Sequence, residues 1–265
     1  APAESDLSTC AQGEWGSWVD RETLEREYVS TAWLFVLPGL AALALHAAML
    51  YQELFTLGGL NLSFFNAVSL AAWTMAGLLL ISALSKPVEN LAILALPLAA
   101  ITVLLDLRFP GSRLLSEDAG WQLRLHVLTS MLAYSLLTLA SAQAILLAVQ
   151  DNHLRRHHPG GFIRALPPLQ TMESLLFEMI GVGFALLSVA LITGFVYLED
   201  MFAQHLVHKT VLSIVAWCAF AMLLWGRFRF GWRGRKAIRW TLVGFAVLML
   251  AYFGSKAVIE LILKR

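Results

Sequence analysis

Four histidines are the side chains of this sequence with the most chemistry to offer. His46, His126, His205 and His208 each lie inside or beside a long apolar stretch, whereas the other three histidines lie in a polar connection at 153–158. Neutral imidazole is a good ligand for haem iron and for transition metals. Because an ionisable side chain is costly to bury in a bilayer, each of the four is a candidate functional residue. The alternative is that each forms only a hydrogen bond between helices.

Other reactive side chains do not form a recognisable catalytic group. Cys10 lies in a polar segment and Cys218 in an apolar one, so we expect no disulfide between the two cysteines, and the sequence has no Cys-x-x-Cys motif. The spacing of residues indicates no pair of catalytic carboxylates, no serine–histidine–aspartate set and no phosphate-binding loop. We therefore predict that the protein is not an enzyme.

The composition indicates which elements position the histidines. The chain of 265 residues is 58% hydrophobic and 14% charged, against about 25% charged residues in globular domains. A bilayer core needs about 20 apolar residues per helix, and an open sheet could not satisfy its backbone groups in lipid. We predict an all-α polytopic integral membrane protein with about seven transmembrane helices, at residues 31–51, 62–83, 90–106, 123–149, 176–198, 206–227 and 237–262.

Charged residues divide the chain into two segments and predict its orientation. Residues 1–30 are polar and acidic and are expected to form a solvated tail, and residues 31–265 form the membrane domain. Lysine and arginine are concentrated in the connections at 84–89, 150–175 and 228–236 and in the adjoining helix ends. The positive-inside rule therefore predicts a cytoplasmic N-terminus and an outward-facing C-terminus, with the four candidate histidines near the outer leaflet. The net charge of +1 argues against nucleic acid as a partner.

Several motifs, in a fixed order over about residues 31–262, resemble the cytochrome c assembly protein family, which includes CcsA-type and HemX-like proteins, and are most similar to its YpjD-like branch. One is His-Val-x-x-x-Met-Leu-Ala-Tyr from His126 to Tyr134. The others are Asn61-Leu62-Ser63 with Asn66 and Ser69, Met172-Glu173 through Thr193-Gly194, Lys209 to Trp217, Leu224-Trp225-Gly226, Gly231-Trp232-Arg233-Gly234 and Tyr252-Phe253-Gly254.

The departures from the family pattern limit the activity that the resemblance implies. CcsA-type members present haem on a tryptophan-rich outer loop, but the corresponding residues 197–209 contain no tryptophan. Two further histidines of the family pattern are replaced by Trp225 and Leu263. The resemblance therefore implies a haem-binding accessory factor in cytochrome assembly at a bacterial inner membrane, without haem ligase activity and with the C-terminus in the periplasm.

The same resemblance implies a site and partners. His126, which matches the family motif, is expected to ligate the iron of non-covalently bound haem, and His208, His205 and His46 are the candidates for a second ligand. Membrane lipid and haem-handling or cytochrome assembly proteins are the expected partners.

Two other functions stay open from the sequence. Gly181, Gly183, Gly194 and Pro97 could break helices around a pathway, as in a small-molecule permease subunit. The basic segment 227–239 could contact a partner, as in a membrane scaffold protein. Haem absorbance of the purified protein separates the first interpretation from these two.

Overall fold

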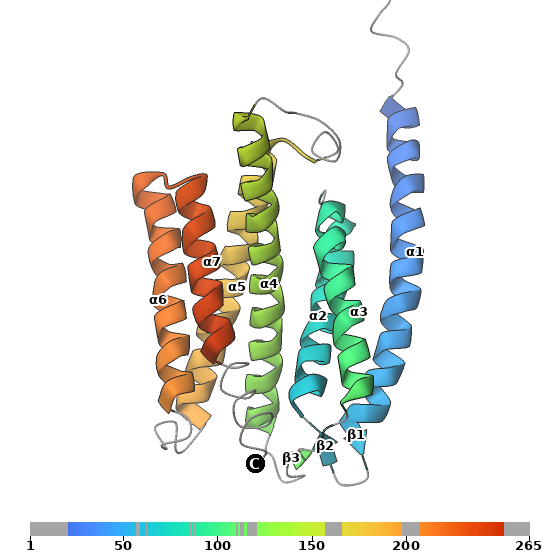
Figure 1. Ribbon diagram of the computed structural model, residues 1–265, viewed down its shortest axis with the longest axis vertical. Coiled ribbons are helices and arrows are strands. Elements are labelled where there is room, and N and C mark those ends of the chain that lie inside the picture. Colours follow the sequence, from blue (N-terminus) through green and yellow to red (C-terminus); the bar gives the residue numbers. More distant parts are fainter. Residues whose placement is uncertain are drawn as a thin grey trace, which may run out of the picture. The chain divides into compact units, whose positions relative to one another are not determined.

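A computed structural model describes residues 21–56, 59–61, 63–84, 86, 88–109, 111, 114–115, 121–156, 166–197 and 207–251. Within these residues the chain forms seven α-helices, each corresponding to one of the predicted spans (Figure 1). They are α1 (Arg21–Leu54), α2 (Phe64–Ala83), α3 (Ala92–Arg108), α4 (Trp121–Arg155), α5 (Leu169–Tyr197), α6 (Val207–Phe230) and α7 (Arg235–Met249). A short 3-10 helix, η1 (Glu89–Leu91), precedes α3.

Five of the described helices have the length and apolar composition that a bilayer requires. Among the described residues, five helices are long and apolar enough to cross a membrane: α2, η1 with α3, α4, α5 and α6. Large apolar side chains such as Leu104 of α3, Ile192 of α5 and Val243 of α7 are exposed, as lipid-facing side chains must be. The protein is thus an all-α polytopic membrane protein, as predicted. The predicted end of the last span, 252–262, lies outside the described residues.

Helix α1 begins earlier than the apolar pattern indicated. It starts at Arg21, so ten residues of the predicted acidic tail are helical. Glutamate is a good helix former, and acidic side chains are favourable near a helix N-terminus. The chain divides into two compact units, residues 1–42 and 43–265. In the described part of the first unit there is one helical segment, in which Pro38 removes a backbone donor.

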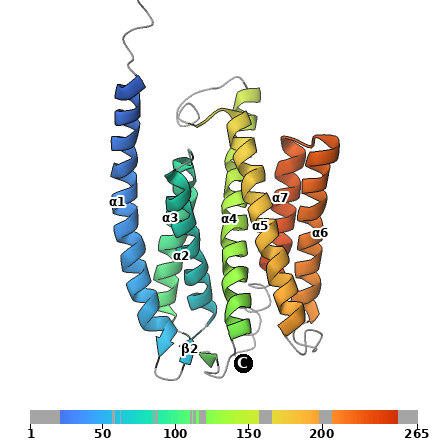
Figure 2. The same ribbon diagram turned by 180° about the vertical axis from the view of Figure 1, so that it is seen from behind.

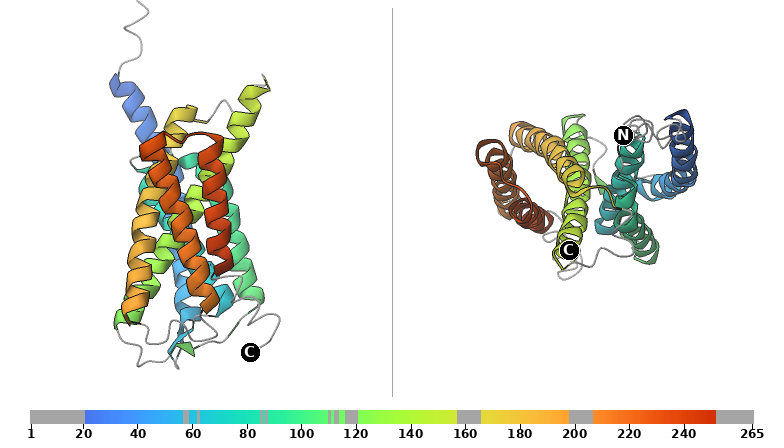
Figure 3. Two further views of the ribbon diagram at one scale, coloured as in Figure 1. Left: turned by 90° about the vertical axis from the view of Figure 1, so that its left-hand side faces the viewer. Right: turned by 90° about the horizontal axis from the view of Figure 1, so that it is seen from above.

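The second unit, from Leu43 onward, is organised around α4. This helix packs most extensively against α5 and also contacts α2 and α7, while α6 packs on α7 and α5. Seen from behind and from above, α2 and α3 lie on one side of α4, and α5, α6 and α7 lie on the other (Figures 2 and 3). A Cβ atom added at Gly183 of α5 would lie 2.8 Å from the Leu137 side chain of α4. The glycine therefore lets the two helices approach closely.

A small antiparallel sheet connects the loops at one end of this unit. Strand β1 (Phe55–Thr56) pairs with β2 (Gly59–Asn61), which pairs with β3 (Leu114–Leu115). The Asn61 side chain donates to the Gly111 carbonyl oxygen at 2.8 Å. The Ser63 hydroxyl accepts a hydrogen bond from the backbone N–H of Asn66 and caps α2. The sheet was not predicted, because strands of two or three residues have no measurable alternation.

Candidate functional site

The structure describes two of the four candidate histidines with their side chains. His126 lies on α4 and His46 on the second-unit part of α1. His205 lies outside the described residues, and His208 belongs to the first turn of α6, where the side chain is not described. One side of the second unit carries six helix ends (Figure 1). They are the beginnings of α2, α4 and α6 and the ends of α1, α3 and α5.

His126 is held by helix α5 through one of its ring nitrogens. Its Nδ1 atom lies 2.9 Å from the Ala190 carbonyl oxygen and 3.3 Å from the Thr193 hydroxyl oxygen. Because a carbonyl oxygen can only accept, Nδ1 must carry the proton of this hydrogen bond. The neutral imidazole then has its lone pair on Nε2, the other ring nitrogen. A histidine that ligates a metal has this arrangement, with the second ring nitrogen donating to a backbone carbonyl or carboxylate.

Small residues of α5 allow the imidazole to reach the helix backbone. Ala190 and Gly194 are buried, and Thr193 directs its hydroxyl back to the Val189 and Ala190 carbonyl oxygens at 2.9 and 3.0 Å. The His126 ring is about half-buried between α4 and α5. It lies five residues inside α4, about 7–8 Å from the first residue of that helix. That is about half a turn deeper than a helix beginning at 123 would place it, since α4 begins at Trp121.

An aromatic pair lies between His126 and the ends of its helices. The rings of Trp121 on α4 and Tyr197 on α5 are 6.1 Å apart, and both side chains are exposed. Trp121 precedes His126 by five residues, and Tyr197 follows Thr193 by four, so the pair is about one turn closer to the helix ends. Exposed tryptophan and tyrosine at this level are typical of the membrane–water interface.

Tyr134, in the same family-like motif as His126, has a packing role. Its hydroxyl donates to the Leu248 carbonyl oxygen of α7 at 3.0 Å, and the side chain is buried. Tyr134 therefore joins α4 to α7, while His126 joins α4 to α5.

His46 lies in a second polar contact, between α1 and α2. Its Nε2 atom lies 3.0 Å from the Ser69 hydroxyl oxygen, and both side chains are buried. Asp106, near the end of α3, is also buried. One oxygen of Asp106 is buried without a hydrogen-bond partner among the described residues. Asp106 was missed in the sequence, although an acidic residue inside an apolar run is a signal of burial with a partner.

The structure does not bring His46 and His126 to one site. His46 bonds to α2, whereas His126 bonds to α5 on the other side of α4. In the part of the chain that the structure describes, no three histidine, cysteine, aspartate or glutamate side chains lie close enough together to hold a metal ion. Among the described side chains, His126 therefore offers one imidazole nitrogen to a ligand.

Comparison with known proteins identifies the family. The family model described as cytochrome C assembly protein matches residues 34–263. The chain belongs to the cytochrome c assembly protein family. Inner membrane protein YpjD of Escherichia coli K12 is 32% identical over 229 residues, which cover 86% of this chain and 87% of YpjD. Cytochrome c biogenesis protein CcsA of Thermosynechococcus vestitus is 27% identical over 243 residues, which cover 77% and 73% of the two chains. No solved structure matches the chain.

The comparison confirms the resemblance that the motifs indicated, including its YpjD-like character. It also agrees with the membrane architecture, because the relative in Escherichia coli is an inner membrane protein. The roles of individual histidines are a separate question, which depends on the geometry around His126 and His46.

Proposed function

We propose that the protein is a haem-binding accessory factor for cytochrome assembly in a bacterial inner membrane, and that it holds haem without ligating it to a cytochrome. Membership of the cytochrome c assembly family supports the role in assembly. The observation that carries haem binding is the hydrogen bond from His126 Nδ1 to the Ala190 carbonyl oxygen. It leaves Nε2 as the nitrogen that can bind an iron atom.

The residues around His126 fit haem as a ligand in three ways. Bound haem would supply an iron atom that takes an imidazole nitrogen as ligand. The Ala190 carbonyl fixes the tautomer and the orientation of the imidazole. The half-buried His126 ring lies about two turns or less from the ends of α4 and α5. A ligand bound there can therefore keep its own charged groups in water while its apolar part lies among apolar side chains. Trp121 and Tyr197 offer aromatic surface on the side nearer the helix ends.

A second histidine that could hold the iron is proposed from the start of α6. His208 ranks above His205 because it lies within the helix, where a ring can be fixed. His46 ranks last because its Nε2 atom is engaged by Ser69 and its contacts lie between other helices. Haem-handling or cytochrome assembly proteins are the proposed partners, with the N-terminus in the cytoplasm and the C-terminus in the periplasm.

The permease interpretation loses the feature on which it rested. Helix α5 is continuous through Gly181, Gly183 and Gly194, and α3 is continuous through Pro97. Gly183 serves the close packing of α5 against Leu137 rather than a break in the helix. A haem-binding role is therefore the function that the geometry supports best.

The test is the absorbance spectrum of the purified protein during titration with haem. His126→Ala should lower haem occupancy at least tenfold and shift the Soret band of any remaining complex, because the proposed iron ligand is removed. His153→Ala is the matched control, since His153 is exposed near the far end of α4 and its Nδ1 atom bonds the Val149 carbonyl of its own helix. If the His126 variant binds haem like the parent protein, the proposed site is wrong and a scaffold role takes precedence.

A further inference from the structure

The connection between α6 and α7 is shaped by three glycines. Gly231 and Gly234 have φ values of +62° and +55°, which favour glycine over other residues. The backbone N–H of Trp232 donates to the Gly226 carbonyl oxygen at 3.2 Å. A Cβ atom at Gly226 would lie 2.5 Å from the Trp232 ring, so only glycine lets the indole lie against α6 there. The family-like motifs at 224–226 and 231–234 therefore build one turn, which the proposed haem site does not use.

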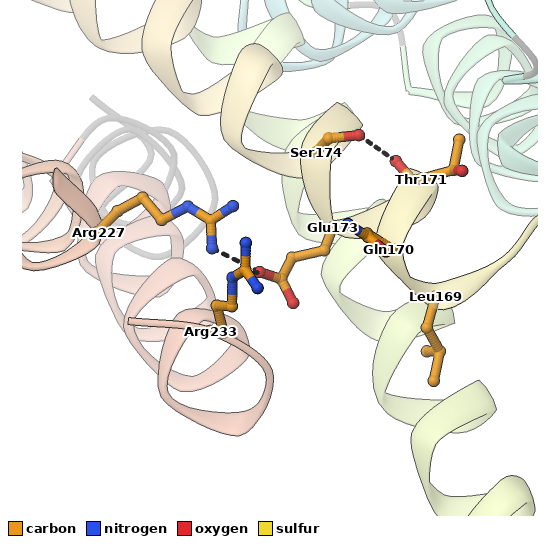
Figure 4. A pocket seen from close by; sticks show the side chains of 7 residues that line it. All are labelled: Leu169, Gln170, Thr171, Glu173, Ser174, Arg227 and Arg233. Atoms are coloured by element: carbon orange, nitrogen blue, oxygen red, sulfur yellow. Dashed lines mark hydrogen bonds and ion pairs between the residues drawn. The ribbon is translucent and has the colours of Figure 1, made fainter. Parts of the chain in front are cut away.

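This turn directs two arginines to one carboxylate of α5. Arg227 Nη1 lies 2.7 Å from Glu173 Oε1, and Arg233 Nε lies 3.4 Å from the same oxygen (Figure 4). The Arg227 guanidinium also lies over the Phe177 ring, 4.5 Å from its centroid. The Glu173 side chain is largely buried, with 16% of its surface exposed, whereas 63% of the Arg233 side chain is exposed. Two guanidinium groups thus share one carboxylate, which leaves an excess of positive charge.

A cavity of about 560 Å³ adjoins these arginines, and we call it the arginine cavity. Its other wall is the first part of α5, with Gln170, Thr171 and Ser174 among the lining residues (Figure 4). The first backbone N–H groups of an α-helix have no partner within the helix and attract anions. Each guanidinium has five N–H donors, and the hydrogen bonds of Arg227 to Glu173 and to the Trp232 carbonyl both use Nη1. The cavity therefore combines donors and positive charge from two sides.

The surroundings of the arginine cavity indicate where an anion would come from. Trp225, Phe228 and Phe230, on the last turns of α6, are 64%, 91% and 65% exposed. Exposed aromatic side chains beside basic ones are typical of the layer where lipid headgroups meet hydrocarbon. An anion that belongs to a lipid can place its charge against the arginines and its chains along the apolar face of α6.

We propose that the arginine cavity binds the phosphate group of an anionic phospholipid. Arg233 supplies the exposed, movable guanidinium, and Arg227 is the fixed one because Glu173 and Phe177 hold it in place. A fork of N–H donors matches the oxygens of a phosphate group, which makes arginine the suitable residue at both positions.

The experiment is lipid binding by the full chain in phosphatidylcholine micelles titrated with phosphatidylglycerol, followed by native mass spectrometry of the retained lipid. Arg233→Gln should weaken retention of phosphatidylglycerol about tenfold, the effect expected for loss of one charge-assisted hydrogen bond. Arg233 is exposed and lies in a turn that its glycines define, so this variant should fold.

Arg229→Gln is the matched control. Arg229 lies two residues from Arg227, about 200° around α6, and is outside the set of described residues that line the cavity. This variant makes the same change of charge and should retain phosphatidylglycerol like the parent protein. Equal weakening by the two variants would show that diffuse surface charge binds the lipid and would overturn the proposed cavity site. If inorganic phosphate displaced phosphatidylglycerol at millimolar concentration, the assignment of the site to lipid would be overturned as well.

Discussion

Replacing Ser69 by alanine would remove the hydroxyl that joins α2 to His46 of α1. The serine is 1% exposed, and its hydroxyl oxygen lies 3.0 Å from His46 Nε2. The substitution therefore breaks a buried hydrogen bond between two helices and leaves the His46 ring nitrogen without that partner. Alanine fits the space, so the effect should come from the missing hydroxyl rather than from a change of packing volume.

The expected size of the effect follows from the buried hydrogen bond that the substitution removes. An unsatisfied buried donor or acceptor costs about 1–3 kcal/mol, but hydrogen bonds between transmembrane helices average only about 0.6 kcal/mol. For this bond, we expect Ser69→Ala to lower the free energy of unfolding by about 0.5–2 kcal/mol. Equilibrium unfolding in mixed micelles titrated with dodecyl sulfate measures this difference.

Ser174→Ala provides a matched comparison, because its hydroxyl is exposed and donates to the Thr171 carbonyl of its own helix. It should change the free energy of unfolding by less than about 0.5 kcal/mol. A double-mutant cycle of His46→Ala with Ser69→Ala should give a coupling energy of about 0.5–1.5 kcal/mol. A coupling energy near zero would refute the idea that the contact between these two side chains contributes to stability.

Three further predictions concern the turn, the orientation and the activity of the chain. Gly226→Ala should lower the free energy of unfolding by about 1–3 kcal/mol through overpacking against Trp232, and near-ultraviolet circular dichroism should show disturbance of the Trp232–Trp240 stack, whose rings are 5.9 Å apart. A phosphatase that is active only in the periplasm should be active when fused after Arg265 and inactive when fused within 150–175, because basic residues concentrate in the latter segment. Expression of the chain beside an apocytochrome, in cells without their own assembly system, should give no covalent haem, because residues 197–209 contain no tryptophan; covalent haem on the apocytochrome would contradict the accessory role.

The sequence predicted the helices well because each crossing of a bilayer requires a long apolar stretch, which is visible in the sequence. The bounds differ where charged residues extend a helix beyond the apolar run, as at Arg21 of α1 and Arg155 of α4. The three short strands carry no periodic signal in the sequence, so their pairing was not predictable. Local patterns thus indicate the spans but not the connections between them.

The candidate site was predictable only in part. His126 was identified from its motif and its place in an apolar stretch, but its partner is a backbone carbonyl 64 positions later in the chain. Every residue has such a carbonyl, so no residue type indicates the partner. The contact of Arg227 with Glu173 joins positions 54 residues apart, and it follows from the glycine turn and the packing of α5 rather than from spacing.

The acceptor of His126 is a main-chain atom, and this has a consequence for how the site can be altered. No side-chain replacement at position 190 can delete the Ala190 carbonyl oxygen. The contact depends on the separation of α4 and α5, and Gly183 helps to set that separation two turns away, about 10 Å along α5. A bulky residue at position 183 would push the helices apart, release the Nδ1 proton from its acceptor and let the imidazole exchange tautomers. The choice of ring nitrogen that carries the proton therefore depends on the spacing between two helices, which is set at a distance from the ring itself.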